Sequence, residues 1–268
     1  MSFFSKYAYY IGSIWTLLKG VRYPWKLIPL FLRSKPNQLQ MIEMPQKDLK
    51  MWVRGRMDAW SVKEAMLDRF YERSGTLIQP YWTIVDVGAA IGEFTVVAGK
   101  AAPKGRVFAI EPNPDSVALL RQNLKSNHVN NVEIIENGLW HEISLQTLNL
   151  INYEPLQAIT HNSELMLPGQ IQFETQTLTS FIREHQLTRI DLLKSDSEGA
   201  EYDFLLTSSA DVLQVIQRIM MEYHDLDDER DHRKLAEFLT ANGFQVRLTP
   251  NQVHGNIGYL YAERISLE

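Results

Sequence analysis

The chain has 268 residues, the length of one α/β domain with additions, and it is long enough to bury a sizeable hydrophobic core. It carries 27 Lys and Arg against 32 Asp and Glu, and this net charge of −5 argues against a nucleic-acid partner. The absence of cysteine excludes disulfides, thiolate metal sites and thiol nucleophiles, and it fits a reducing, cytoplasmic compartment.

Residues 1–42 differ from the rest of the chain because they contain six basic residues, many aromatic residues and no acidic residue. The apolar stretch from Tyr7 to Leu18 is too short to span a bilayer, and no small-residue cleavage site of a secretory signal follows it. We therefore expect a helical extension over residues 1–48, followed by a catalytic domain over residues 49–268. The extension would act as a lid, as a peripheral anchor on the anionic inner face of the membrane, or as both.

Two elements are expected between the extension and the first core strand. Leu49 to Val53 alternates like an edge strand. Ser61 and Glu64 have the spacing of a capping box, and the apolar stripe that follows predicts one helix ending at Gly75.

The central motif is a predicted strand, a glycine loop and a helix. Thr83 to Val87 is a β-branched run typical of a buried parallel strand, and the small residues from Gly88 to Gly92 allow a tight turn into a helix that begins near Phe94. Free backbone N–H groups at such a helix terminus suit the anionic end of a nucleotide-like ligand.

A second strand, Arg106 to Ile110, ends in Glu111, about the offset from Gly88 at which a strand-end carboxylate reaches ribose hydroxyls in doubly wound folds. The loop lacks the third glycine that a pyrophosphate cradle needs. S-adenosylmethionine is therefore the favoured cofactor. An NAD-dependent oxidoreductase and a non-catalytic, membrane-associated binding module remain the alternatives.

The middle of the chain continues the strand–helix alternation. Asn113 is expected to cap a helix with Pro114 at its first position. The next strand, Val132 to Ile135, is followed by Asn137 and Gly138 at the same edge of the sheet, where a side-chain amide can bond to adenine. A strand over residues 141–150, a long loop over residues 152–170 and a strand over residues 173–178 follow, and Thr179 or Ser180 is expected to cap a short helix.

The last core strands end in acidic residues. Arg189 to Lys194 leads to Asp196, which occupies the sheet edge where open α/β folds place ligands, whereas Glu198 and Glu201 suit the N-terminus of the next helix. The strand over residues 217–223 leads to Glu222 and His224, which share one face because strand side chains alternate. A histidine base there would titrate near ~6.5. A charged loop, a helix around Leu235 and two final strands, at 244–248 and 257–262, complete the pattern.

These patterns define the candidate site residues. The expected cofactor-binding residues are Asp86, Gly88, Ala89, Ala90, Gly92, Thr95, Glu111, Pro112, Asn113, Asn137, Gly138 and Asp196. The expected catalytic residues are Asp196, Glu222 and His224, which act either as base and orienting acid or as ligands of a divalent metal such as Mg²⁺ or Mn²⁺.

Several of these motifs together resemble the FkbM-type methyltransferase family, from about Leu49 to the C-terminus. The matching segments are Asp86-Val87-Gly88-Ala89-Ala90-Ile91-Gly92, Glu111-Pro112-Asn113, the run Ile190 to Glu201, and Glu222-Tyr223-His224. The chain departs from the family at Ala90, where a larger polar residue is usual, and at Ser195 and Ser197, where apolar residues are usual.

The resemblance implies a doubly wound, Rossmann-like α/β fold of class I methyltransferases, with a seven-stranded, mostly parallel sheet and an antiparallel final hairpin. It also implies S-adenosylmethionine as methyl donor and O-methylation of a sugar, glycolipid or polyketide-like natural product, which would include carbohydrate modification. The similarly folded catechol O-methyltransferases use a metal, so the metal alternative stays open.

Overall fold

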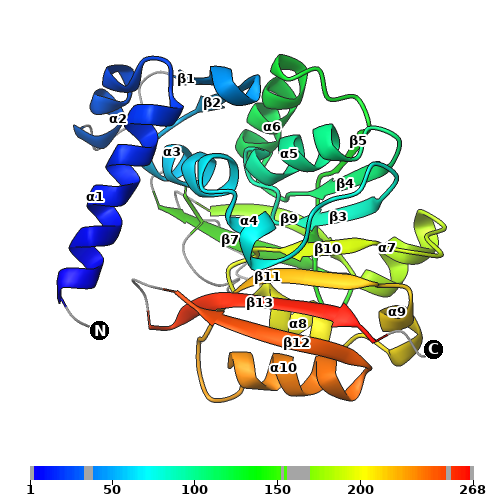
Figure 1. The fold of residues 1–268 in the computed structure, drawn as a ribbon. Coiled ribbons are helices and arrows are strands. Elements are labelled where there is room, and N and C mark those ends of the chain that lie inside the picture. The colour runs from blue at the N-terminus through cyan, green and yellow to red at the C-terminus, as the bar shows by residue number, and fades with distance from the viewer. Residues whose placement is uncertain (1–2, 33–38, 152–153, 156–169, 252–254, 266–268) are drawn as a thin grey trace.

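A seven-stranded sheet forms the centre of the molecule (Figure 1). The structure is a computed structural model that describes residues 3–32, 39–151, 154–155, 170–251 and 255–265. The strands are β3 (Thr83–Val87), β4 (Arg106–Ile110), β5 (Val132–Ile135), β10 (Leu192–Ser195), β11 (Arg218–His224), β12 (Phe244–Pro250) and β13 (Ile257–Arg264). Their order is β12-β13-β11-β10-β3-β4-β5. Only the pairings of β13, with β11 and with β12, are antiparallel.

Alternating side chains of these strands bury both faces of the sheet. Val85 and Phe108 belong to a core cluster with residues of α7 (Leu178–Glu184), α8 (Ala200–Leu206), α9 (Ala210–Gln214) and α10 (His232–Ala241). Their neighbours Ile84 and Val107 pack with residues of α5 (Glu93–Ala101) on the other face, and α6 (Pro114–Ser126) also contributes to the core there. A parallel strand covered on both faces needs apolar residues at nearly every position, which explains the continuous runs in the sequence. The expected doubly wound fold is confirmed.

A second, four-stranded sheet lies beside the central one. It contains β6 (Gly138–Leu139), β9 (Gln170–Gln176), β7 (Leu145–Ile151) and β8 (Glu154–Pro155), in that order. The strands expected near residues 141–150 and 173–178 are therefore present with shifted bounds, but their pairing was not anticipated, because β7 and β9 are separated by the long segment that follows β7. Most of the loop expected at residues 152–170 lies outside the described residues.

The helix after β9 corrects one sequence-based expectation. Thr177, and neither Thr179 nor Ser180, is the N-cap of α7, and its side chain accepts a hydrogen bond from the backbone N–H of Ser180. The Ser180 hydroxyl is within hydrogen-bonding distance of the Thr177 backbone N–H in return, so the two residues form a reciprocal cap. Serine takes the place that glutamate or glutamine usually holds in this motif, which is why the sequence pattern was missed.

The N-terminal extension is helical at first and ends in a hairpin. Its elements are α1 (Phe3–Gly20), η1 (Pro24–Leu27), α2 (Ile28–Leu32), β1 (Gln40–Met44) and η2 (Pro45–Lys47), and β1 pairs antiparallel with β2 (Leu49–Val53). The expected strand at residues 49–53 is confirmed, whereas β1 was not foreseen. The domain boundary expected after residue 48 falls in the turn between these two strands.

The helix expected from Ser61 to Ser74 is broken into three pieces. These are α3 (Arg56–Val62), a π-helical turn η3 (Lys63–Leu67) and α4 (Phe70–Ser74). Because α3 already begins at Arg56, Ser61 is an interior residue and the predicted capping box is wrong. Arg69 adopts a left-handed conformation with φ of 53°, which separates η3 from α4. The predicted end at Gly75 is confirmed.

Over residues 12–20, where side-chain burial is described, helix α1 packs on η3 through one face. Ser13, Leu17 and Val21 are buried, and the Ser13 hydroxyl accepts a hydrogen bond of 2.7 Å from the ammonium group of Lys63. The opposite face exposes Trp15 by 59%, together with Ile14 and Leu18. Among the described residues, no helix combines the length and the apolar character needed to cross a bilayer.

Candidate active site

The glycine loop after β3 lies between the ends of β4 and β10. Gly88 has a φ of 72°, and a Cβ atom at this position would collide with the carbonyl oxygen of Asp196. The backbone N–H groups of Gly88 and Ala89 both donate to the carbonyl of Ile110. Glycine is therefore required at residue 88 both for the left-handed backbone and for the close approach of the two loops.

A buried ion pair between Asp86 and Lys194 supports the glycine loop. The Asp86 carboxylate lies 3.0 Å from the ammonium group of Lys194 and accepts a hydrogen bond from the Thr95 hydroxyl. Lys194 also donates to the carbonyl of Gly88. Burial lowers the pKa of Lys194, but the nearby carboxylates, Asp86 foremost, prevail and raise it. Asp86 and Thr95, which were expected to contact the cofactor, thus support the glycine loop. The contribution of Lys194 to this support was not predicted from the sequence.

Glu111 joins the loop after β4 to the glycine loop. One of its carboxylate oxygens accepts the backbone N–H of Ala90 and the other accepts that of Asn113, each at 2.8 Å. Burial raises the pKa of Glu111 against the opposing effect of these two bonds. Each oxygen keeps a further lone pair, so the carboxylate can still accept hydrogen bonds from two hydroxyl groups.

A cavity opens at the carboxyl ends of β3, β4 and β10, and we call it the strand-end cavity. It encloses about 660 Å³ of empty space, counting the part open to solvent. Its lining residues are Val87, Gly88, Ile110, Glu111, Pro112, Gly138, Leu139, Leu148, Phe173, Asp196, Ser197, Glu198 and Ala200. Gly88, Glu111, Pro112, Gly138 and Asp196 were expected at a cofactor site, and the structure brings all five together.

The other expected cofactor residues lie outside the lining of the strand-end cavity and make contacts within the protein. Ala90 donates its N–H to Glu111, Gly92 begins α5 with a left-handed backbone, and Asn113 caps α6. The Asn137 side chain accepts a hydrogen bond from Gln176. These residues, and Ala89, are not among those that line the strand-end cavity.

The second sheet supplies three lining residues that the sequence did not reveal, and one of them, Leu139, lies on β6. Leu148 lies on β7 and Phe173 on β9, and the Phe173 ring lies so near to Gly138 that an added Cβ atom there would come within 2.6 Å of it. Both residues look like ordinary strand positions in the sequence. Only the pairing of β9 with β6 brings them to the ligand edge of the central sheet.

A smaller and more polar cavity, the acidic chamber, lies on the other side of Asp196. It encloses about 290 Å³, and its lining residues are Ser61, Glu64, Ala65, Tyr71, Glu93, Asp196 and Glu222. Four of these seven residues carry carboxyl groups. Asp196 lines both cavities, so a group bound in one can meet a group bound in the other at this residue.

Burial changes the ionisation of the chamber's side chains. It raises the pKa of Glu93 to about 8, which Lys194 opposes. It also raises the pKa of Glu222 well above its usual range, and the Asp196 carboxylate adds to this shift. Burial also raises the pKa of the Tyr71 phenol, and the nearby acids Asp196 and Glu222 add to this shift. The chamber therefore disfavours additional negative charge.

His224 lies at the end of β11 among three carboxylates. Its Nε2 atom is 3.4 Å from Glu198 and 3.8 Å from Glu222, and its Nδ1 atom is 3.5 Å from Glu201. Burial lowers the pKa of His224, but the contact with Glu201 and the charges of Glu198 and Asp196 raise it to about 10. The imidazole is therefore a cation at neutral pH, paired with the surrounding carboxylates.

Glu198 and Glu201 were both expected to stabilise a helix N-terminus, but the structure places them differently. Glu201 is fully buried and accepts hydrogen bonds from the Ser197 hydroxyl and the Gly199 N–H, which fixes the turn before α8. Glu198 lines the strand-end cavity instead. Burial raises the pKa of Glu198 to about 7, against the opposing charge of His224.

Within the part of the chain that the structure describes, two groups of side chains have the spacing to hold a metal ion. Ligand atoms of Asp196, Glu198 and His224 lie within 4.8 Å of one another, so the structure brings Glu198 into the metal set that the sequence had predicted as Asp196, Glu222 and His224. A metal there would have to displace the proton from His224, which the surrounding acids disfavour.

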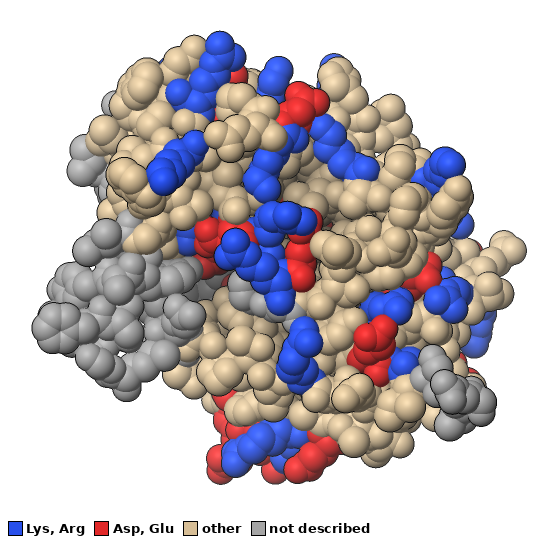
Figure 2. Space-filling view, viewed as in Figure 1, with Lys and Arg blue, Asp and Glu red and all other residues tan. Residues whose placement is uncertain are grey.

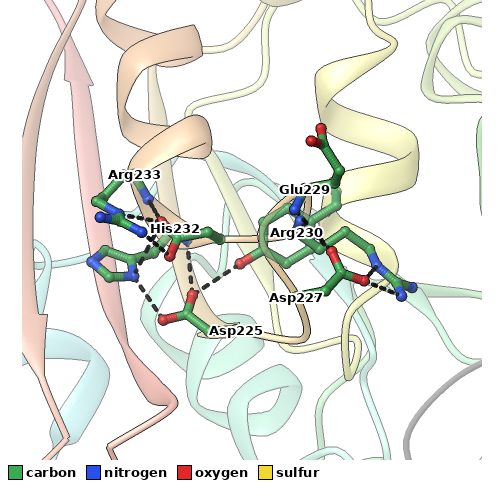
Figure 3. Close-up of polar contacts among 8 residues, drawn as sticks. Asp225, Asp227, Glu229, Arg230, His232 and Arg233 are labelled. Carbon is green, nitrogen blue, oxygen red and sulfur yellow. Dashed lines mark hydrogen bonds and ion pairs between the residues drawn. The ribbon is translucent and has the colours of Figure 1, made fainter.

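The second group, Asp225, Asp231 and His232, is occupied by contacts that hold the charged loop before α10 (Figure 3). Asp225 accepts the backbone N–H of His232 and lies 2.8 Å from its ring, and Asp231 pairs with Arg233 while capping α10. Acidic and basic side chains lie next to one another over this region, at the lower edge of Figure 2. These contacts account for the cluster as a structural one.

Comparison with known proteins gives a family match over most of the site-bearing domain. The family model described as "Methyltransferase FkbM domain" matches residues 86–246. Methyltransferase 1 of Beauveria bassiana is 26% identical over 202 residues, covering 69% of this chain and 80% of that protein. The 31-O-demethyl-FK506 methyltransferase FkbM of Streptomyces tacrolimicus is 26% identical over 212 residues, with the same coverage of both chains.

The chain also matches part of a much longer protein. It is 27% identical over 227 residues to the AMB antimetabolite synthetase AmbE of Pseudomonas aeruginosa, and the match spans 69% of this chain but 10% of the synthetase. Among solved structures, M. jannaschii TYW2 in complex with AdoMet is similar with a TM-score of 0.48 and 15% identity, covering 87% of this chain and 89% of that one. Precorrin-6y C5,15-methyltransferase from Geobacter metallireducens has a TM-score of 0.43 and 18% identity, covering 80% and 90%.

Proposed function

Because the chain belongs to the FkbM methyltransferase family and is thus an S-adenosylmethionine-dependent methyltransferase, we propose that it methylates a hydroxyl group of a sugar, glycolipid or polyketide-like natural product. The observation that carries the proposal is the meeting of two cavities at Asp196. The name of the Streptomyces relative, which is a methyltransferase for 31-O-demethyl-FK506, supports a natural-product acceptor. Family membership leaves an NAD-dependent oxidoreductase without support.

The strand-end cavity fits the nucleoside part of the cofactor. The left-handed Gly88 and its close contact with the Asp196 loop leave the backbone bare of side chains at the cavity floor. Glu111 has lone pairs left for ribose hydroxyls, and Phe173 and Leu148 offer an apolar wall for a base. When bound, S-adenosylmethionine supplies an electrophilic methyl group.

Asp196 is the base that the geometry favours. A sugar hydroxyl is a poor nucleophile at neutral pH, so transfer is faster when a carboxylate accepts its proton during the attack. Asp196 faces both cavities, whereas the raised pKa of His224 keeps that imidazole protonated and unable to accept a proton. We assign His224 the task of holding Glu222 and Glu198 in place, and we give the metal-free mechanism precedence.

The direct test is a methyl-transfer screen of the full chain against saccharide, glycolipid and polyketide alcohols, run with and without a chelator. We expect transfer to an oxygen atom at a rate that the chelator leaves unchanged. Asp196→Asn should lower the maximal rate by a factor of about 10² to 10⁴, the usual size of general-base catalysis. Transfer to carbon or nitrogen would contradict the proposed reaction, and loss of activity on chelation would show a metal enzyme.

We also propose that the N-terminal extension makes peripheral contact with an anionic membrane surface. The exposed residues Trp15, Trp25 and Ile28 lie among Lys19 and Lys26, and residues 1–42 contain no acid. Exposed aromatic and aliphatic side chains interleaved with lysine are typical of interfacial helices.

Vesicle sedimentation tests this contact. The full chain should bind vesicles containing phosphatidylglycerol and release them at high salt, and the double substitution Trp15→Ser with Trp25→Ser should abolish binding without changing cofactor affinity. If binding is equally strong to neutral vesicles, or if the variant binds as the natural sequence does, the extension has no such role.

A further inference from the structure

Two asparagine side chains of α6 are bonded to the backbone of β2, which lies beside that helix (Figure 1). Asn127 accepts the N–H of Lys50 at 2.9 Å and donates to the carbonyl of the same residue at 2.6 Å. Asn123 accepts the N–H of Trp52 at 2.7 Å and donates to its carbonyl at 3.1 Å. Because β1 pairs with the other edge of β2, the two asparagines take the place of a neighbouring strand.

The spacing of the two asparagines matches that of the strand. Four residues along a helix rise about 6 Å, and two residues along an antiparallel strand rise about 6.8 Å. A side-chain amide also carries an acceptor and a donor, as a backbone peptide group does. Asn123 is fully buried and Asn127 is 4% exposed, so these bonds are shielded from water.

Asn123 also reaches the glycine loop. Its Nδ2 atom donates to the carbonyl of Ile91 at 2.8 Å, in addition to the carbonyl of Trp52. The Nδ2 atom of Asn127 instead makes its second bond to the carbonyl of Asn123, at 2.8 Å. Of the two asparagines, both within the described part of the chain, only Asn123 therefore joins the β1–β2 hairpin to the glycine loop.

The glycine loop has a backbone conformation that requires such support. Ala90 has a φ of 46°, a left-handed conformation that a residue with a Cβ atom keeps only where its surroundings impose it. Glu111 accepts the N–H of Ala90, and Asn123 donates to the carbonyl of Ile91, the next residue. Because Glu111 also lines the strand-end cavity, the conformation of the loop and the position of this carboxylate depend on the same contacts.

The hairpin and the glycine loop share a hydrophobic core with the N-terminal extension. One cluster of buried residues contains Leu17 and Val21 of the extension, Ile42 and Met51 of the hairpin, and Ile91 of the loop. Apolar packing of this kind has little directional preference. The hydrogen bonds of Asn123 are directional, so they fix the loop in one position against the hairpin.

We propose that Asn123 is a positioning residue of the cofactor site, which fixes the glycine loop against the β1–β2 hairpin so that the bound cofactor and the hairpin stabilise each other. Asn123 acts through the loop, since it is not among the residues that line the strand-end cavity. The inference rests on the placement of S-adenosylmethionine in that cavity under the proposed function, and it is independent of the acceptor. Linkage makes the effect reciprocal, because a contact that strengthens cofactor binding is itself strengthened when the cofactor binds.

A matched pair of variants separates the loop from the hairpin. Asn123→Ala removes the bonds to Trp52 and to Ile91, whereas Asn127→Ala removes two bonds to the hairpin and leaves the loop attached. Calorimetric affinity for S-adenosylhomocysteine, measured where circular dichroism shows both variants folded, should fall at least about tenfold in Asn123→Ala, because a buried carbonyl of the loop loses its donor. Asn127→Ala should leave the affinity nearly unchanged. An equal loss in the two variants, or no loss in either, would show that Asn123 only attaches the hairpin.

Hydrogen exchange tests the reciprocal effect without relying on alanine. Asn123→Asp keeps the size of the side chain and the acceptor for the N–H of Trp52, but it places an oxygen where the donor to Ile91 stood. By NMR, S-adenosylhomocysteine should slow exchange of the Trp52 amide in the natural sequence and in Asn127→Ala, but not in Asn123→Asp. Unchanged exchange in the natural sequence would overturn the proposal even if no variant folds.

Glu111→Ala, measured in the same series, separates this inference from the proposed function. Loss of S-adenosylhomocysteine affinity in Glu111→Ala together with unchanged affinity in Asn123→Ala would uphold the placement of the cofactor and refute the role of Asn123. Unchanged affinity in both variants would refute the placement itself, and the inference with it.

Discussion

His224 shows how three neighbouring acids change the chemistry of one residue. The position of a histidine two residues after Glu222 on a strand suggested a base that titrates near ~6.5. In the structure Glu198, Glu201 and Glu222 surround the ring, and the pKa of His224 rises to about 10 despite burial. The imidazolium thus joins the ends of β10 and β11 electrostatically, and under the proposed function a carboxylate, that of Asp196, is the base.

This charge state predicts a pH-dependent contribution to stability. Because the folded pKa of His224 lies above its unfolded value, its contribution is fully present below pH ~6.5 and is lost as the pH rises through about 10. The free energy of unfolding, measured by urea titration, should therefore differ more between the natural sequence and His224→Gln at pH 6 than at pH 10. A difference that stays constant over this range would mean that His224 is neutral in the folded chain.

Glu111 provides a second test at the residue scale. Its carboxylate bonds the backbone of both loops and lines the strand-end cavity, so Glu111→Ala should weaken S-adenosylmethionine binding at least tenfold, about 1.4 kcal/mol. Glu136→Ala is the control, because Glu136 is half exposed and pairs with Arg121 on the surface. Calorimetric affinities that are equal in the two variants would remove Glu111 from the ribose site.

At the scale of elements, the packing of α1 on η3 fixes the extension to the wall of the acidic chamber. Lys63 begins η3, directly before Glu64 and Ala65 of the chamber, and its buried ammonium group is bonded to Ser13 of α1. The helix and the chamber wall are thus mechanically connected. A membrane contact made by the far face of α1 would therefore lie on the same element that supports the wall of the acidic chamber.

Removing the Ser13 hydroxyl tests this connection. Ser13→Ala leaves a buried ammonium group with one partner fewer and should lower the free energy of unfolding by about 1–3 kcal/mol. Thr16→Ala, one turn along the same helix, removes a hydroxyl that bonds the carbonyl of Gly12 at the surface and should cost much less. Urea titrations that give the same loss for both variants would mean that α1 is only loosely attached.

The sequence predicted elements well where the signal is local, as for β3 with Gly88 and for α6 with its Asn113 cap. It failed where distant segments meet. The second sheet depends on the pairing of β7 with β9 across a long connection, and no pattern within either strand announces a partner. The broken helix over residues 56–74 depends on the left-handed Arg69, a conformation that a non-glycine residue rarely adopts.

For the whole molecule, the strand order explains why the site could be located but not fully built from the sequence. Parallel strands place their carboxyl ends at one edge, so Gly88, Glu111 and Asp196 were correctly expected to lie together. Lys194 was overlooked because a lysine inside a buried strand gives no sign of the carboxylate it meets on the neighbouring strand. The acidic chamber joins α3, η3, α4, α5 and two strand ends, which are brought together only by the complete fold.

The position of the bound cofactor product tests the central claim most directly. A crystal structure of the full chain with S-adenosylhomocysteine should show the ribose at Glu111, the base against Phe173, and the sulfur facing Asp196 at the entrance to an acidic chamber free of nucleoside. If the nucleoside occupies the acidic chamber, or if the sulfur faces away from Asp196, the proposed placing of the cofactor in the strand-end cavity is wrong.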